Sequence, residues 1–112
     1  MSDVPIGSAE AFAEGVGTLV EVDDERIAVF RVDGELWAIA DRCSHAEASL
    51  SEGEVFDHEV ECPRHGAVFD VRTGMPLSLP ATKPVRTYRT RVDESGFVAV
   101  QIDPLNDEEA PQ

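Results

Sequence analysis

Short runs of apolar and β-branched residues, separated by turn residues, recur along most of the chain. Residues 25–32 and 35–40 are two such runs, and they flank Asp33-Gly34, a dipeptide typical of a two-residue type I′ hairpin turn. Further strands are predicted at residues 18–22, 54–56, 59–61, 67–71, 85–92 and 97–102. The pattern predicts an all-β fold of about eight or nine short strands, arranged as an antiparallel β-sandwich or barrel.

The N-terminal segment has a weaker pattern. Val4-Pro5-Ile6 is compatible with a short strand at the edge of a sheet, where a proline is tolerated. Ser8 is a suitable cap for a single helical turn from Ala9 to Glu14, and Gly15 is suited to end it. We therefore expect one edge strand and one helical turn before the main β region begins.

Length and charge restrict the function classes. A chain of 112 residues is expected to form one domain, which we assign to residues 1–103, followed by a frayed acidic tail at 104–112. The net charge of −14 argues against nucleic acid or an anionic membrane as a partner. No apolar stretch approaches the ~20 residues of a membrane span, and the N-terminus lacks the features of a signal peptide. We expect a cytoplasmic protein, a location that also fits the presence of only two cysteines.

The chemistry is concentrated between residues 43 and 65. Cys43-Ser44-His45 opens this window and Cys62-Pro63-Arg64-His65 closes it, with sixteen residues between His45 and Cys62. Two thiolates and two imidazoles are enough to hold a metal centre, either zinc or an iron–sulfur cluster. Gly66 follows the second pair directly, where a tight turn favours a positive φ. The window therefore predicts two ligand loops that face each other.

The same residues allow three other interpretations. A Cys43–Cys62 disulfide is disfavoured in a reducing compartment and leaves His45 and His65 unexplained. Structural zinc accepts two cysteines and two histidines, but its usual pattern separates the cysteine pair from the histidine pair. The third is chance, with free buried thiols and surface histidines. His58 lies outside both pairs and is expected to be a solvated turn residue.

The spacing and its flanks resemble the Rieske family, in particular the small soluble ferredoxins that feed multicomponent aromatic-ring dioxygenases. Besides the two pairs, the resemblance includes Gly66, Phe69, Asp70, Thr73, Gly74, Pro76, Pro80 and Pro84. It implies a Rieske-type fold with a cluster-binding tip at about residues 41–84, formed by two ligand loops and a proline loop that covers the cluster. It also implies one [2Fe–2S] cluster per chain, with the inner iron held by Cys43 and Cys62 and the outer iron by His45 and His65.

The resemblance further implies a one-electron carrier and not an enzyme. Its electrons would come from a flavin-dependent ferredoxin reductase and go to a terminal Rieske non-haem iron oxygenase, and the carrier is expected to be a monomer. No convincing acid, base or nucleophile set lies outside the metal window. Similar small Rieske proteins serve nitrite reductase or iron–sulfur assembly, and a zinc-stabilised binding module without a redox role is the alternative from another class.

Residues around the predicted cluster indicate a low reduction potential. High-potential Rieske proteins have a cysteine pair bridging the two ligand loops, a serine hydroxyl that donates to a bridging sulfur and a tyrosine hydroxyl that donates to a cysteine sulfur. In this chain the positions of the bridging cysteines are occupied by Ala48 and Arg64. The serine position is occupied by Ala67 and the tyrosine position by Phe69. Without these donors the reduced cluster is less stabilised, so a midpoint near the bottom of the ~−150 to +300 mV range is expected. A local basic patch is also expected around the tip, formed by Arg42, Arg64 and Lys83.

Overall fold

The computed structural model describes residues 2–22, 25–42, 48–64, 66–78 and 83–102. Three of the four expected ligands, the middle of the proline loop and the acidic tail at 104–112 lie outside these described residues. The ligands in question are Cys43, His45 and His65.

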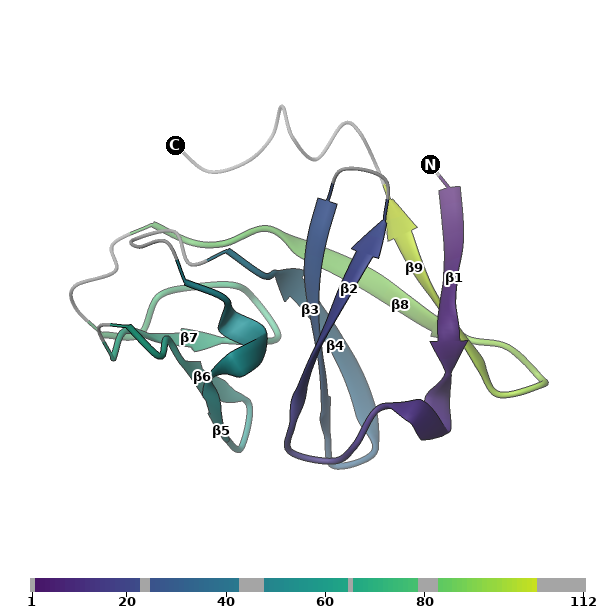
Figure 1. The fold of residues 1–112 in the computed structure, drawn as a ribbon, viewed down its shortest axis with the longest axis horizontal. Coiled ribbons are helices and arrows are strands. Elements are labelled where there is room, and N and C mark those ends of the chain that lie inside the picture. Colours follow the sequence, from purple (N-terminus) through teal and green to yellow (C-terminus); the bar gives the residue numbers. More distant parts are fainter. Residues whose placement is uncertain (1, 23–24, 43–47, 65, 79–82, 103–112) are drawn as a thin grey trace.

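Within the described residues the fold consists of two antiparallel sheets (Figure 1). The larger sheet has the strand order β1-β9-β8-β4-β3-β2, and the smaller has the order β5-β6-β7. The strands are β1 (Ser2–Ser8), β2 (Gly17–Val22), β3 (Glu25–Val32), β4 (Glu35–Ala40), β5 (Glu54–Phe56), β6 (Glu59–Glu61), β7 (Val68–Asp70), β8 (Thr87–Val92) and β9 (Phe97–Ile102). Two 3₁₀ turns accompany them, η1 (Ala9–Ala11) and η2 (Leu50–Glu52). The all-β prediction is confirmed.

The β3–β4 hairpin has the predicted turn. Its strands pair up to Val32 and Glu35, which leaves two residues in the loop. Asp33 and Gly34 both have positive φ, of 54° and 80°. A type I′ turn requires positive φ at both positions, and its twist matches that of the flanking strands. Neither strand of this hairpin is an edge of the larger sheet, because β3 and β4 lie between β2 and β8.

Both faces of β3 are buried. Ala28 and Phe30 belong to one hydrophobic core, and Ile27 and Val29 belong to a second. The second core is completed by the larger sheet and its N-terminal segment, through Phe12, Val22, Ala38, Tyr88, Val98 and Val100. The first core is completed mostly by the tip, through Leu50, Val60, Cys62, Ala67, Phe69, Val71 and Val85. The small sheet and η2 therefore pack on one face of the larger sheet, as the position of η2 beside β2 in Figure 1 also shows.

The predicted helical turn from Ala9 to Glu14 is wrong in length. Ser8 caps the turn as expected, accepting a hydrogen bond from the Glu10 N–H, but the turn ends at Ala11. Phe12 leaves the helical path because its side chain is buried in the second core. The Arg31 guanidinium then binds the Ala9 and Phe12 carbonyl oxygens at 3.0 and 3.3 Å, in place of further helical hydrogen bonds.

The sequence correctly predicted His58 to lie in a turn, the one between β5 and β6, but the prediction that it is solvated is wrong. It is half-buried, and its ring meets the Trp37 ring edge-on at a centroid distance of 5.8 Å. Its carbonyl oxygen also accepts a 2.9 Å hydrogen bond from the Val71 N–H. The β5–β6 turn thus folds back onto the larger sheet. Two predicted strands are also shorter than expected, because β7 begins only at Val68 and β8 only at Thr87.

No helix in the described part of the chain is long and apolar enough to cross a bilayer.

Candidate metal centre

Cys62 is the one expected ligand within the described residues. It directly follows β6 and is 1% exposed, and its thiol is free of any disulfide. Its N–H donates to the Ala67 carbonyl at 2.6 Å, and its own carbonyl accepts from the Gly66 N–H at 3.0 Å. These two bonds close a tight loop over residues 62–67. A buried, unbridged thiol in such a loop fits an iron–sulfur ligand, which must be deprotonated and shielded from solvent.

Gly66 has the positive φ predicted for it, at 77°. A side chain here would be strained, since few residues with a Cβ adopt this region. Its Cβ would also come within 3.2 Å of the Glu61 carboxylate oxygen Oε2. The Glu61 side chain can move aside, so it is the positive φ that favours glycine immediately after the second ligand pair.

Asp41 closes the base of the first ligand loop; it directly follows β4 and is fully buried. Its backbone carbonyl accepts from the Leu50 N–H at 2.6 Å, and its Oδ1 accepts from the Ser51 N–H at 2.9 Å. Its own N–H donates to the Arg26 carbonyl on β3 at 2.9 Å. The chain entering this loop is thereby tied to the chain leaving it. Sequence reasoning missed Asp41; the available signal was a carboxylate at the end of an apolar strand, two residues before Cys43.

The proline loop begins along β7 and is closed at its base. The Leu77 N–H donates to the Val68 carbonyl at 2.7 Å, and the Val68 N–H donates to the Ser78 hydroxyl oxygen at 3.0 Å. At the base, the Val85 N–H donates to the Gly74 carbonyl at 2.8 Å. The expectation that this loop covers the cluster stays a prediction, because residues 79–82 lie outside the described part of the chain.

The flanks of the two ligand pairs meet at one hollow of about 620 Å³. Arg42, which precedes Cys43, and Arg64, which precedes His65, both contribute to its lining. The other lining residues are Arg26, Asp41, Ala48, Ser49, Glu52 and Pro63. The described residues contain no group of three metal-ligating side chains, so the full ligand set stays a prediction.

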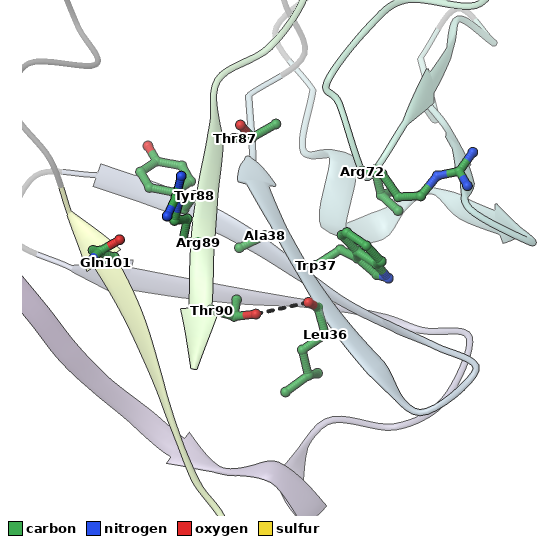
Figure 2. Close-up of a pocket in the computed structure, with 10 residues that line it drawn as sticks. Leu36, Trp37, Ala38, Arg72, Thr87, Tyr88, Arg89, Thr90 and Gln101 are labelled. Carbon is green, nitrogen blue, oxygen red and sulfur yellow. Dashed lines mark hydrogen bonds between the residues drawn. The ribbon is translucent and has the colours of Figure 1, made fainter. Parts of the chain in front are cut away.

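A larger hollow of about 660 Å³ lies elsewhere, where β4 and β8 separate (Figure 2). The two strands pair only at Ala38–Tyr88 and Ile39–Thr87. Beyond that point the Thr90 hydroxyl donates to the Leu36 carbonyl at 3.0 Å, as the dashed line in Figure 2 shows. This hollow contains no residue of either ligand loop and shares no lining residue with the first one, so it is not the metal site.

Asp70, the last residue of β7, forms an ion pair with Arg72. The Arg72 guanidinium donates to both carboxylate oxygens of Asp70, at 3.0 and 3.2 Å, and the Arg72 N–H adds a bond of 2.8 Å. These bonds from Arg72 hold the pKa of Asp70 below its ordinary value, although partial burial opposes them. The pair fixes the turn from which the proline loop starts.

Comparison with known proteins agrees with this geometry. Residues 2–89 match the family model of the Rieske [2Fe-2S] domain. The chain is 46% identical over 98 residues to the anthranilate 1,2-dioxygenase ferredoxin subunit of Burkholderia cepacia, covering 88% of this chain and 90% of the relative. It is also similar to the solved ferredoxin of carbazole 1,9a-dioxygenase from Nocardioides aromaticivorans, with a TM-score of 0.85 and 39% identity over 92% of this chain and all of that one.

A further solved structure is a complex of reduced oxygenase and oxidized ferredoxin in carbazole 1,9a-dioxygenase. The matched chain is 38% identical to this one with a TM-score of 0.82, over 88% of this chain and 100% of the matched chain. The chain belongs to the Rieske [2Fe-2S] domain family. It carries a [2Fe–2S] cluster and is an electron carrier of the ferredoxin type, not a catalytic enzyme.

Proposed function

We propose that this protein is the ferredoxin component of a multicomponent aromatic-ring dioxygenase. It takes single electrons from a flavin-dependent ferredoxin reductase and passes them to a terminal Rieske non-haem iron oxygenase. The observation that carries the proposal is its similarity along most of its length to ferredoxins of such systems, at 46% identity in sequence and a TM-score of 0.85 in structure. The solved oxygenase–ferredoxin complex of a related system supports the oxygenase as the acceptor.

The cluster, when bound, supplies one-electron redox chemistry; the chain's own residues hold and shield it. Our proposed ligands are the two thiolates of Cys43 and Cys62 and the two imidazoles of His45 and His65. The burial of Cys62 supports its part in this set. Hydrogen bonds at Asp41 and at Gly66 tie the ends of the two loops together, and fixed loop ends limit the rearrangement that accompanies electron transfer.

We further propose that residues 1–103 act as one cytoplasmic, monomeric domain. The shared first core supports this unit, because the buried apolar residues described in the tip all pack in the same core as Ala28 and Phe30 of the larger sheet. A nitrite reductase or cluster-assembly client is the less supported alternative, since the relative described above is a dioxygenase subunit. A zinc-stabilised module without a redox role would be colourless and would contain no sulfide.

Metal analysis and spectroscopy test the ligand set. Purified protein is expected to contain iron and acid-labile sulfide in equal amounts and to show visible bands that bleach on dithionite. Replacing any one of the four proposed ligands with alanine should abolish these bands. His58→Ala is the matched control, because His58 is the remaining histidine of the chain and should leave the spectrum unchanged. A coloured, sulfide-containing His65→Ala protein would overturn the proposed set.

Electron transfer tests the partners. The reduced protein should be reoxidised rapidly by the oxygenase encoded nearest to its gene, and the flavin reductase encoded there should reduce it with NADH. Rapid reoxidation by a nitrite reductase, with no reaction toward the oxygenase, would replace the proposed client with the alternative one.

A further inference from the structure

Asp41 combines complete burial with a position beside the first ligand loop. Its side chain is 1% exposed, and it stands two residues before Cys43. Two residues of chain span at most ~7 Å, so the Cα atoms of Asp41 and Cys43 lie no further apart than that. Asp41 also borders the hollow of about 620 Å³, together with Ala48 from the end of the first loop and Pro63 from the second. A buried negative charge is therefore held at the flanks of both loops.

The positive charge that faces Asp41 is shared and exposed. Among the described residues, the cation that binds its carboxylate is Arg26, whose Nη2 lies 3.5 Å from Oδ2. The same guanidinium binds Glu21 at 3.1 Å and the Ser49 hydroxyl at 3.3 Å. Its side chain is 51% exposed, so solvent screens the charge of Arg26 more than that of Asp41. The carboxylate is thus held in place by Arg26 and the Ser51 N–H, while its negative charge is only partly cancelled.

We propose that the Asp41 carboxylate lowers the reduction potential of the cluster. The inference rests on the proposed function, in which Cys43 is a ligand of a one-electron centre. Reduction adds one negative charge to that centre, and a negative charge nearby opposes it. Charges in the protein interior interact more strongly than charges in water, so the burial of Asp41 increases the effect. Asp41 thereby makes the reduced protein a stronger electron donor, besides closing the base of the loop.

This charge acts separately from the absent hydroxyl donors at Ala67 and Phe69. Those two positions lower the expected potential because they withhold hydrogen bonds from sulfur, which is an effect of direct contact. Asp41 needs no contact with the cluster, because the field of a charge acts over several ångströms. Its contribution is therefore a second and independent cause of a low potential.

Two substitutions that change the local charge in opposite directions test the proposal. Asp41→Asn removes the negative charge, while its amide oxygen can still accept from the Ser51 N–H. Arg26→Gln removes the positive charge that faces Asp41, at a half-exposed position. Their matched controls are Asp3→Asn and Arg91→Gln, which break an ion pair of 2.8 Å between β1 and β8. Figure 1 shows β1 at the opposite end of the molecule from the small sheet of β5, β6 and β7.

A redox titration followed in the visible bands measures the midpoint of each holoprotein. Asp41→Asn should raise the equilibrium constant for reduction by about threefold to tenfold, and tenfold corresponds to ~59 mV for a one-electron couple. Arg26→Gln should lower this constant, by a smaller factor, because solvent screens the exposed guanidinium. Asp3→Asn and Arg91→Gln change the net charge of −14 by the same single unit as their counterparts and should move the midpoint much less. The shift in Asp41→Asn should persist at high salt, whereas the shift in Arg26→Gln should fade.

A disturbed loop gives no reason for shifts of opposite sign, so the two substitutions together separate charge from structure. An Asp41→Asn midpoint that moves no more than that of Asp3→Asn would overturn the proposal, and so would a rise in Arg26→Gln. If Asp41→Asn does not retain its cluster, Arg26→Gln decides alone, because its side chain lies at the surface. An unchanged midpoint of Arg26→Gln at low salt would then overturn the proposal.

The same samples separate this inference from the proposed function. A wild-type protein whose visible bands do not bleach with dithionite contradicts the electron-carrier function itself. A Cys43→Ala protein that keeps these bands contradicts the proposed ligand set. A wild-type protein that titrates normally, while all four charge variants share its midpoint, contradicts only the role of Asp41.

Discussion

The Ser51 N–H donates a 2.9 Å hydrogen bond to Oδ1 of Asp41, across the base of the first ligand loop. Asp41 is the only charged residue in the described part of the chain that is completely buried. Burying a carboxylate is costly unless hydrogen bonds compensate it. Here they do, and the same bonds hold together the two ends of the loop that contains Cys43 and His45.

Replacing Asp41 with alanine should therefore destabilise the fold. The Ser51 N–H would lose its partner at a partly buried position, and an unsatisfied buried donor costs ~1–3 kcal/mol at most. Asp41→Asn is the matched control, because an amide oxygen can still accept from Ser51. Denaturant midpoints of both variants measure the effect. We expect Asp41→Ala to lose more stability and more bound iron than Asp41→Asn. Equal losses would show that the hydrogen bond from the Ser51 N–H to the Asp41 side chain is unimportant.

The reduction potential should respond to a hydroxyl at position 67. Ala67 is fully buried, and its carbonyl oxygen accepts from the Cys62 N–H. By the family resemblance, a serine here donates to a cluster sulfur and stabilises the reduced state. A tenfold stabilisation corresponds to ~59 mV for a one-electron couple, and we expect Ala67→Ser to raise the midpoint by about that amount.

A redox titration followed in the visible bands measures this shift. The wild-type midpoint is expected near −150 mV, and a value above about +100 mV would contradict the low-potential assignment. Ala48→Ser is a suitable control, because it adds a hydroxyl to the tip at a position where the resemblance places no hydroxyl donor. A midpoint that moves equally in both variants would mean that added polarity alone is responsible.

The elements that the sequence predicted well are set by local chemistry. Asp33-Gly34 favours one turn type whatever surrounds it, and the hairpin formed as expected. Gly66 likewise has the positive φ that its place after the second ligand pair indicated. These features depend on neighbours within a few residues, so a pattern of residues is sufficient to find them.

The features that were missed depend on contacts between distant segments. The edge-on packing of His58 against Trp37 joins residues 21 positions apart, and nothing near His58 in sequence indicates it. The helical turn after Ser8 was overestimated because Arg31, far along the chain, binds the carbonyls that would have continued it. Tertiary contacts of this kind override local propensity.

Stability should depend on the ionisation of Asp70. Bonds from Arg72 hold its pKa below the ordinary value of 3.8, so the folded state favours the charged form. The resulting stabilisation is fully present above that ordinary value and is lost as the pH falls through the lower folded pKa. Asp70→Asn should therefore be less stable than wild type at neutral pH, and the gap should narrow under acid conditions.

Denaturant midpoints of wild type and Asp70→Asn, measured from neutral pH to about pH 3, test this. The difference between the proteins cancels acid effects that both share, including loss of the cluster. Arg72→Ala supplies the control, since removing the guanidinium should bring the pKa of Asp70 back toward its ordinary value and flatten the pH dependence. A constant gap over the whole range would contradict the role of Arg72.

Removing the cluster should loosen the tip before the larger sheet. The small sheet has three strands of three residues each, too little to be stable alone. It is held by the first core, where Cys62 packs with Val60 and Phe69, residues paired across β6 and β7. Among the described residues the second core includes none from the tip, so we do not expect its stability to depend directly on the cluster.

Hydrogen exchange of holo and chelator-treated protein can separate the two regions. Amides of β6 and β7 should lose protection in the apo form, while those of β3 around Ile27 and Val29 should keep most of theirs. The reason is that cluster binding stabilises the ligand loops and the tip on which they pack, and this stabilisation is lost when the cluster is removed. Reconstitution with iron and sulfide should restore the tip. Uniform loss of protection across both sheets would mean that the two cores unfold as one unit, and that the cluster stabilises the whole domain.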